Sequence, residues 1–234
     1  MESSTPFKAL VQSLFPPTCL HCKAQIRLPE ILCSRCDDEL ASCLIPVCEM
    51  PGVTPKARNV WGTWYYRLGS PIRSLHRALK YDANLRAGAL IATRIQVPSQ
   101  VSERVPESAV CIPIPSHRIR ILERGLQQTT VLADAVASKL SIRAHSTALV
   151  RRSLSHSQSK LGRSGRLANL ANAFEVVSPV LVGHALLVDD VMTTGATLDA
   201  AAEVLESQGI EVTLLVAAFR REAFSLPKTD PKVA

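Results

Sequence analysis

Aromatic side chains are scarce in this chain, and several common functional signatures are missing from it. Phe, Trp and Tyr make up only 4% of the 234 residues, which argues against a protein that binds nucleic acid by stacking bases on aromatic platforms. No apolar run approaches the roughly 18–20 residues that span a bilayer, so no membrane insertion is expected. The G-x-x-x-x-G-K-[ST] pattern of P-loop proteins does not occur. Residues 1–17 contain Glu2 and an interrupted apolar stretch, unlike a signal peptide, and the cytoplasm is the expected location.

The chain does have enough apolar sequence for a core, and an excess of positive charge. Hydrophobic residues make up 47% and charged residues 20%, as in a globular domain of ordinary size with a small module attached. With 27 basic and 20 acidic residues the formal net charge is +7, which favours a polyanionic ligand such as a polyphosphate or nucleic acid. A generally basic protein without such a ligand would carry the same charge, so the ligand has to be argued from motifs.

The cysteines are clustered, since six of the seven lie between Cys19 and Cys48. Cys19-x-x-Cys22 and Cys33-x-x-Cys36 form two pairs that can supply the four thiolates of a tetrahedral structural zinc site. A reducing cytosol disfavours structural disulfides, and this region has too few large apolar residues to hold about 50 residues together as a core. Zinc would supply the missing stability. A CxxC redox pair and incidental thiols are the alternatives, and two pairs in series favour zinc over either.

Two more cysteines, Cys43 and Cys48, follow at C-x₄-C spacing with no second pair after them. They either mark a degenerate second metal site or pack beneath the first, and packing is the preferred interpretation. We therefore expect a zinc-binding module over residues 1–50, a linker over 51–59, an α/β domain over 60–224 and a disordered tail over 225–234.

The most informative stretch is Leu186–Leu198, which reads LLVDDVMTTGATL. Its apolar run without polar alternation is typical of a strand buried on both faces of a parallel sheet, and open α/β sheets place ligands at the carboxyl ends of such strands. That end carries Asp189 and Asp190, which suit neutral hydroxyls or a metal-bridged group. A small, hydroxyl-rich turn follows, made of Thr193, Thr194, Gly195, Ala196 and Thr197.

This turn offers backbone N–H groups and hydroxyls at a helix N-terminus, which suits a dianionic phosphate. Gly195 would let the backbone approach the ligand without a Cβ in the way. The alternative is a strand-to-helix turn with threonine caps and no ligand.

The surrounding segments predict a doubly wound α/β sheet. Strands are expected at residues 60–68, 109–115, 174–177, 180–182 and 211–219, and helices at 70–80, 129–140 and 198–208. Lys80, at the end of the first of these helices, either complements the helix dipole in solvent or faces a ligand cleft. Cys111 lies in an apolar run and is expected to be an inert core thiol.

Two basic segments are candidates for contact with a polyphosphate. The first carries Arg118, Arg120 and Arg124, with Gly125 beside the last; a basic loop at a strand end can bind pyrophosphate through charge-assisted, bidentate hydrogen bonds. The second is serine-rich and has five Lys or Arg residues between Arg151 and Arg166. This second segment is either a lid that closes over bound polyphosphate and excludes water or a disordered surface loop. The first segment is either a pyrophosphate loop or a solvated turn.

Leu186–Leu198 resembles the 5-phosphoribosyl-1-pyrophosphate (PRPP) motif of type I phosphoribosyltransferases. In that family the acidic pair holds the ribose 2- and 3-hydroxyls and the threonine-rich loop holds the 5-phosphate. The resemblance therefore implies a PRPP site made of Asp189, Asp190, Thr193, Thr194, Gly195, Ala196 and Thr197.

Two further segments narrow the resemblance to the ComF/GntX family, which joins an N-terminal zinc module to a phosphoribosyltransferase domain. A strand ending P-x-P leads into Arg124-Gly125-Leu126-Gln127-Gln128, which is similar to the family's R-G-F-N-Q, with Leu for Phe and Gln for Asn. The next segment follows the family's spacing of R, T, Q, L, R, N and A-F, with Ser in place of Thr. Its matching residues are Arg151, Ser155, Gln158, Leu161, Arg166, Asn169 and Ala173-Phe174.

The resemblance covers most of the chain and implies a type I phosphoribosyltransferase-like fold behind a small zinc module. It assigns Arg118, Arg124 and Gly125 to a pyrophosphate loop and Arg151, Gln158 and Arg166 to a lid. The implied ligand is PRPP with its Mg²⁺, in addition to structural Zn²⁺.

Two functions follow from the resemblance. One is transfer of the phosphoribosyl group to an acceptor that the sequence does not identify, with displacement of pyrophosphate. The other, implied by the family's role in competence, is binding of PRPP and single-stranded DNA without transfer. A PRPP-responsive regulator is a third possibility. No residue stands out as a general base, and the oligomeric state is open.

Overall fold

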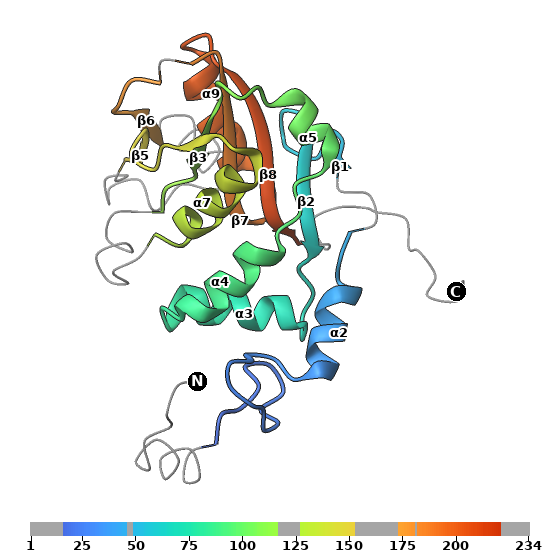
Figure 1. The fold of residues 1–234 in the computed structure, drawn as a ribbon. Helices are drawn as coiled ribbons and strands as arrows, with labels where there is room; N and C mark the ends of the chain where they lie inside the picture. The colour runs from blue at the N-terminus through green and yellow to red at the C-terminus, as the bar shows by residue number, and fades with distance from the viewer. Residues whose placement is uncertain (1–15, 46–48, 117–126, 153–172, 181, 221–234) are drawn as a thin grey trace, which may run out of the picture.

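A computed structural model describes residues 16–45, 49–116, 127–152, 173–180 and 182–220. Its centre is a six-stranded sheet with the order β1-β2-β8-β7-β3-β4 (Figure 1). Only β1 runs antiparallel to its neighbour, and the other pairs are parallel. The strands are β1 Glu49–Met50, β2 Val60–Tyr65, β3 Val110–Pro113, β4 Arg143–Ala144, β7 His184–Met192 and β8 Glu211–Phe219.

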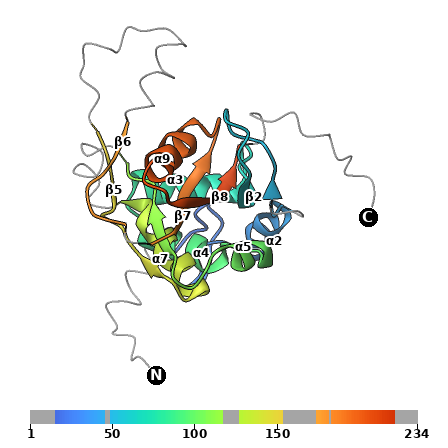
Figure 2. The same ribbon diagram turned by 90° about the horizontal axis from the view of Figure 1, so that it is seen from above.

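Helices cover both faces of this sheet, which confirms the doubly wound α/β prediction (Figure 2). One face packs against α3 Pro71–Tyr81, α4 Leu85–Arg94 and α7 Gln128–Leu140, and the other against α9 Ala196–Glu206. Strand β7 is buried on both sides because Leu186 and Val188 belong to the first core and Ala185 and Leu187 to the second. The short helix α5 Ser99–Arg104 connects α4 to β3.

A second, two-stranded antiparallel sheet consists of β5 Leu149–Arg151 and β6 Phe174–Val176. It flanks residues 153–172, which contain most of the predicted lid and lie outside the described residues. Leu149 of β5 and Phe174 of β6 are both buried in the hydrophobic cluster on the α9 side of the main sheet.

The Cys-rich module contains helix α2 Ser34–Ser42 and lies beyond α3 and α4 in Figure 1. Backbone hydrogen bonds continue it into the sheet, because the amide of Tyr65 donates to the carbonyl of Cys43 (2.8 Å) and that of Ile45 to Thr63 (2.9 Å). Buried side chains of the module, including Leu32 and Leu40, belong to the same hydrophobic cluster as Trp61 of β2. The described part of the module therefore shares a core with the α/β domain.

Several expectations for the elements need adjustment. A strand is expected at 180–182, but neither Val180 nor Val182 lies in a strand, so the prediction is wrong for these two residues. Val182 precedes Gly183, and β7 begins only at His184. Helix α9 starts at Ala196, two residues before the expected position, because Gly195 occupies the N-cap. Ser70 stands at the N-cap of α3, but its hydroxyl donates to the carbonyl of Arg67 (2.7 Å) instead of capping the helix.

Within the described ranges, no helix combines the length and the apolar composition that a membrane crossing requires.

Candidate functional site

The acidic pair lies at the carboxyl end of β7, in the middle of the sheet. β7 pairs with β3 on one side and β8 on the other, so Asp189 and Asp190 stand at the sheet edge where parallel α/β folds bind ligands. Each carboxylate also accepts a hydrogen bond from the next backbone N–H: Asp189 from Asp190 (2.8 Å) and Asp190 from Val191 (2.6 Å). These bonds leave one oxygen of each carboxylate for other partners.

The threonine-rich turn leads directly from β7 into α9. Thr193 and Thr194 are exposed, and Gly195 is buried with φ of +77°, a backbone conformation that L side chains rarely adopt. A Cβ at Gly195 would lie 2.8 Å from Cγ2 and 3.0 Å from Cα of Thr54. The close approach that excludes a side chain here is thus made by Thr54 of the 51–59 segment, a contact that sequence reasoning did not foresee.

The segment expected to be a linker, residues 51–59, is clamped onto α9 next to this turn. The Arg58 guanidinium contacts the buried carboxylate of Asp199 (Nε–Oδ1 3.1 Å) and also pairs with Glu206. The amide of Lys56 donates to Asp199 Oδ2 (3.0 Å), and its ammonium pairs with Glu203. Asp199 lies in the first turn of α9, and the positive charge of Arg58 offsets its negative charge there.

Helix α3 contributes a histidine that the sequence analysis missed. Nε2 of His76 lies 2.8 Å from Oδ2 of Asp190, as an ion-pair contact whose angle falls short of a well-aligned hydrogen bond. The ring of Tyr66 packs edge-on against the His76 imidazole, with centroids 5.7 Å apart. The available signal was that His76 stands four residues after Ile72 and three before Leu79, on the apolar face of α3, where a polar residue needs a partner.

The two carboxyl groups titrate in opposite directions. Burial, followed by the charge of Asp190, raises the pKa of Asp189 well above its usual range. Burial acts on Asp190 in the same sense, but His76 and then Lys80 outweigh it and hold the pKa of Asp190 below its usual range. The site therefore favours one negative charge on the Asp190 side while Asp189 holds its proton more tightly.

A cavity of about 450 Å³ opens beside Asp190, between α3 and the carboxyl ends of β7 and β8. Lys80 lines it, which supports the second of the two interpretations of that residue, a cation facing a cleft. The described residues that line the cavity are Tyr66, Arg73, His76, Arg77, Lys80, Tyr81, Asp190, Val191, Thr193 and Arg220.

The two basic segments fall largely outside the described residues. Arg118, Arg124 and Gly125 lie within residues 117–126, and Gln158 and Arg166 within 153–172. Of the predicted lid residues only Arg151 is described, with its guanidinium over the ring of Phe174 at 5.5 Å. The pyrophosphate loop and the lid remain predictions.

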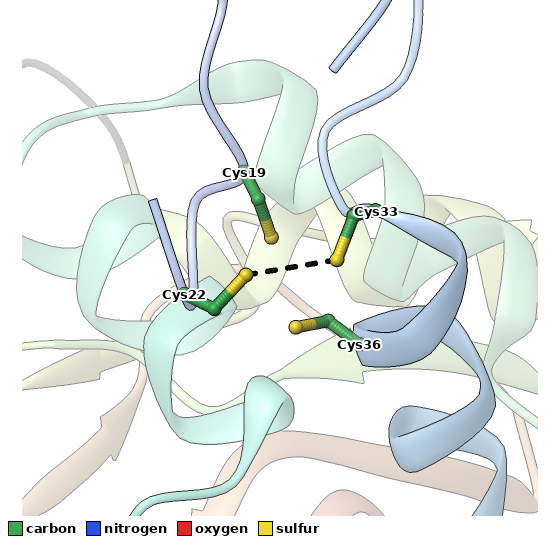
Figure 3. A group of neighbouring side chains, drawn as sticks. All are labelled: Cys19, Cys22, Cys33 and Cys36. Atoms are coloured by element: carbon green, nitrogen blue, oxygen red, sulfur yellow. Dashed lines mark hydrogen bonds between the residues drawn. The ribbon is translucent and has the colours of Figure 1, made fainter. Parts of the chain in front are cut away.

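The four cysteines of the two CxxC pairs converge (Figure 3). Their Sγ atoms all lie within 4.8 Å of one another, and those of Cys22 and Cys33 are 3.6 Å apart. A tetrahedral zinc with Zn–S bonds of about 2.3 Å places its sulfur atoms roughly 3.8 Å apart, so this set fits a structural metal ion. Cys43 is buried in the core, as the packing interpretation expects, whereas Cys48 lies outside the described residues.

The electrostatics of the cluster also fit a cation. Burial would raise the pKa of the Cys19 thiol, but backbone N–H groups of Cys22, Cys33 and His21 lower it to about 6. Burial and the neighbouring cysteines raise the pKa of Cys36. Thiols this close cannot all ionise without a positive ion between them, and a bound metal removes that conflict. His21, which lies between Cys19 and Cys22 in the sequence, is hydrogen-bonded through Nδ1 to the Ser74 hydroxyl (2.8 Å).

Cys111 behaves as the core thiol that the sequence predicts. It is fully buried on β3, and burial raises its pKa to about 12, so it stays a neutral thiol.

Comparison with known proteins finds a matching domain family and relatives that align over most of this chain. A family model described as "Phosphoribosyl transferase domain" matches residues 126–233. The DNA utilization protein YhgH of Salmonella typhimurium is 26% identical over 196 residues, which cover 82% of this chain and 85% of that protein. Competence protein F of Haemophilus influenzae is 24% identical over 224 residues, which cover 86% of this chain and 96% of that protein.

Among solved structures, the orotate phosphoribosyltransferase of Aeropyrum pernix aligns with 80% of this chain and 83% of its own, with a TM-score of 0.37 and 19% sequence identity. The domain match and the relatives that align over most of the chain agree on one assignment. Part of the chain matches a phosphoribosyltransferase domain, and most of its length is similar to a competence protein and a DNA utilization protein, in agreement with the predicted resemblance to the ComF/GntX family.

Proposed function

We propose that the protein binds Mg–PRPP at the carboxyl end of β7 and transfers its phosphoribosyl group to an acceptor. The observation that carries the proposal is the placement of Asp189 and Asp190 at one strand end, followed by a turn over residues 193–195 and then by α9, which begins with Ala196 and Thr197. The turn and the helix N-terminus suit the 5-phosphate, and the acidic pair suits the ribose hydroxyls. Mg²⁺ would enter mainly on the pyrophosphate oxygens of the substrate, as it commonly does at phosphate sites.

In the proposed reaction a nucleophilic atom of the acceptor forms a bond to C1 of the ribose. The C1–O bond to pyrophosphate breaks, its electron pair leaves with pyrophosphate, and the proton of the acceptor passes to solvent. Positive charge develops on the ribose in the transition state, by analogy with other glycosyl transfers. The negative carboxylate of Asp190 would stabilise that positive charge, and Arg118 and Arg124 of the predicted loop would stabilise the leaving group.

We further propose that Cys19, Cys22, Cys33 and Cys36 hold one structural Zn²⁺. Four converging thiols with spacing close to that of a tetrahedral site support this assignment.

Calorimetry with Mg–PRPP tests the site. We expect binding by the wild type and at least tenfold weaker binding by Asp189→Asn with Asp190→Asn, because an amide accepts the ribose hydroxyls less strongly than a carboxylate. Asp134→Asn, which makes the same kind of substitution at one exposed position on α7, is the control and should bind like the wild type. Absence of PRPP binding, or equal binding by all three proteins, would sink the assignment. Pyrophosphate release with a panel of nucleobases and single-stranded DNA then tests transfer.

A second function is favoured by the names of the relatives, one a DNA utilization protein and the other a competence protein. In that case the protein binds PRPP and single-stranded DNA without transferring anything, and its net charge of +7 supports phosphate-driven binding. Binding of PRPP with no turnover on any acceptor would favour it. Its DNA affinity should then fall steeply between about 50 and 200 mM salt, and a salt-independent affinity would contradict it.

A further inference from the structure

Helix α3 presents three cations to the cavity beside Asp190. Arg73, Arg77 and Lys80 line the cavity and share one face of the helix, since they are spaced by four and three residues. None of the three forms a salt bridge with a described residue. Among the described lining residues the one carboxylate is Asp190, and His76 already contacts it.

The end of the cavity formed by Tyr66 and Arg220 combines positive charge with a hydroxyl. Tyr66 lies beyond β2 and is half-buried, and Arg220 follows β8, with its amide bonded to the carbonyl of Met192 (2.9 Å). Burial raises the pKa of Tyr66, while the charges of Arg73 and Arg220 act on it in the opposite sense. The Tyr66 hydroxyl therefore stays protonated near two guanidinium groups and can donate a hydrogen bond to an anion they attract.

The position of this end of the cavity separates it from the expected place of the leaving group. The segment with the predicted pyrophosphate arginines follows β3, which pairs with one edge of β7. Arg220 follows β8, which pairs with the other edge. Because a nucleophile enters opposite the group it displaces, an acceptor for a ribose held over β7 would come from the β8 and α3 side.

We propose that the cavity between α3 and the end of β8 is the acceptor subsite and that it takes an acceptor bearing a phosphate group. This inference rests on the proposed PRPP site and names the class of its second substrate. Arg73 and Arg77 supply guanidinium forks that match phosphate oxygens, and Lys80 adds a point charge near Asp190. A neutral nucleobase would leave the guanidinium groups of Arg73 and Arg77 without a counter-charge.

Phosphate of this kind has two sources, a mononucleotide or the end of a single-stranded polynucleotide. The test uses full-length, zinc-loaded protein saturated with ribose 5-phosphate and Mg²⁺. Ribose 5-phosphate occupies the 5-phosphate and hydroxyl positions but has no leaving group, so no transfer occurs. Thymidine 5′-monophosphate is then titrated by calorimetry, with thymidine as the probe without phosphate and 5′-phosphorylated decathymidylate as the polynucleotide probe.

We expect the wild type to bind thymidine monophosphate at least tenfold more tightly than thymidine. Arg73→Gln and Arg77→Gln should each weaken that binding by about tenfold, the loss typical of one charge-assisted hydrogen bond. Both should keep their affinity for ribose 5-phosphate within about threefold. Arg143→Gln is the matched control, because Arg143 is exposed on β4 at the opposite edge of the sheet, and it should bind every probe as the wild type does.

Failure of the inference differs from failure of the proposed function. If the wild type does not bind ribose 5-phosphate or Mg–PRPP, the PRPP site itself is wrong. If it binds them but binds no phosphate-bearing probe, or binds thymidine equally well, the acceptor subsite is overturned. Loss of ribose 5-phosphate or PRPP affinity in Arg73→Gln and Arg77→Gln would overturn it too, because the cations would then serve the first substrate. Tighter binding of the decanucleotide than of the monophosphate would support the subsite and identify a polynucleotide end; the reverse order would support it with a mononucleotide.

Discussion

Asp189 and Asp190 are neighbours in the sequence, yet their carboxyl groups have opposite surroundings. Asp190 meets His76 of α3, while Asp189 has burial and the charge of its neighbour acting against its ionisation. Pairs of titratable groups whose pKa values are pushed apart are a feature of functional sites. We therefore expect ionised Asp189 to destabilise the ligand-free protein, and contacts with a bound ligand would offset this cost.

The first prediction concerns the stability of Asp189→Asn. The pKa of Asp189 is higher in the folded than in the unfolded chain, so its favourable contribution is present below the unfolded value of about 3.9 and is lost as the pH rises. Asn cannot ionise and keeps an oxygen for the amide of Asp190. We expect Asp189→Asn to raise Tm at pH 7 by about 2–4 °C, corresponding to about 1 kcal/mol, with the gain vanishing near pH 4.

Asp190→Asn is the matched comparison for this experiment. The pKa of Asp190 is lowered in the folded protein. The wild-type carboxylate therefore stabilises the fold above the unfolded pKa, and this contribution is lost as the pH falls. Scanning calorimetry should therefore show a lower Tm at pH 7 for Asp190→Asn. A lower Tm for Asp189→Asn at the same pH would contradict the assignment.

A second prediction concerns pH and His184 at the start of β7. Nε2 of this buried imidazole lies 2.9 Å from the Thr213 hydroxyl, and burial lowers its pKa although Glu211 acts in the opposite sense. The unfolded chain then binds the proton more tightly, so stability is lost as the pH falls from about 6.5 through the folded pKa. The Tm of the wild type should fall more than that of His184→Gln between pH 7 and 5.5. His145→Gln, at a half-buried site elsewhere, should follow the wild type, and parallel curves for all three proteins would refute the role of His184.

At the scale of elements, the PRPP-motif turn is held from behind by the 51–59 segment. Thr54 packs on Gly195, and Arg58 bridges Asp199 and Glu206, which lie about two turns apart on α9. The 51–59 segment therefore acts as a brace that fixes the position of the turn between β7 and α9. We therefore expect a substitution in the brace to weaken binding at the proposed phosphate site, although the substituted residue does not contact the ligand.

Arg58→Ala tests the brace. Removing one partner of a buried ion pair typically costs about 3–5 kcal/mol, and because the Arg58 side chain is 23% exposed we expect about 2 kcal/mol, or roughly 4–8 °C in Tm. The affinity for Mg–PRPP should also fall. Arg152→Ala breaks an exposed pair with Glu175 and should leave Tm unchanged. An Arg58→Ala protein with wild-type Tm would show that the brace contributes nothing.

At the scale of the whole molecule, the Cys-rich module is joined to the α/β domain in several ways. Cys19, Cys36 and Leu40 share a hydrophobic cluster with Leu75 and Leu79 of α3. Two guanidinium groups of α4 bridge the same interface: Arg94 pairs with Asp37 (2.6 Å), and Arg86 donates to the carbonyl of Glu30 (3.0 Å). Helix α3 thus contacts both the module and, through His76, the acidic pair.

We therefore expect metal removal to destabilise the entire protein and not only the module. Structural zinc contributes about 10–16 kcal/mol in small peptides, and a shared core transmits its loss. Purified protein should contain one zinc per chain by mass spectrometry. A strong chelator, or Cys36→Ser, should lower the Tm of a single cooperative transition by more than 10 °C. Cys43→Ser changes a buried cysteine outside the four-cysteine group and should retain the metal. An unchanged thermal transition after complete metal loss would contradict the coupling between the module and the α/β domain.

Local sequence was sufficient for much of this protein. The apolar run of β7 followed by Asp-Asp and a threonine-rich turn predicts its own conformation, since strand, turn and helix signals are all contained within Leu186–Leu198. The two CxxC pairs likewise predict a convergence that the structure confirms, because ligand spacing along the chain determines which thiols can meet. Helix α7 and strand β8 were found within one residue from their apolar patterns.

Contacts between distant segments were decided only by the tertiary structure. His76 and Asp190, Thr54 and Gly195, and Arg58 and Asp199 are each more than 100 residues apart in the chain. No periodicity or motif encodes such pairs, because they arise when packed cores bring two elements together after each has formed. The same holds for the basic cavity, whose walls come from the end of β2, α3, β7 and the residue after β8. The sequence alone therefore determined the PRPP-like motif and the convergence of the four cysteines, and the packing of α3 over the sheet decided what lies beside the motif.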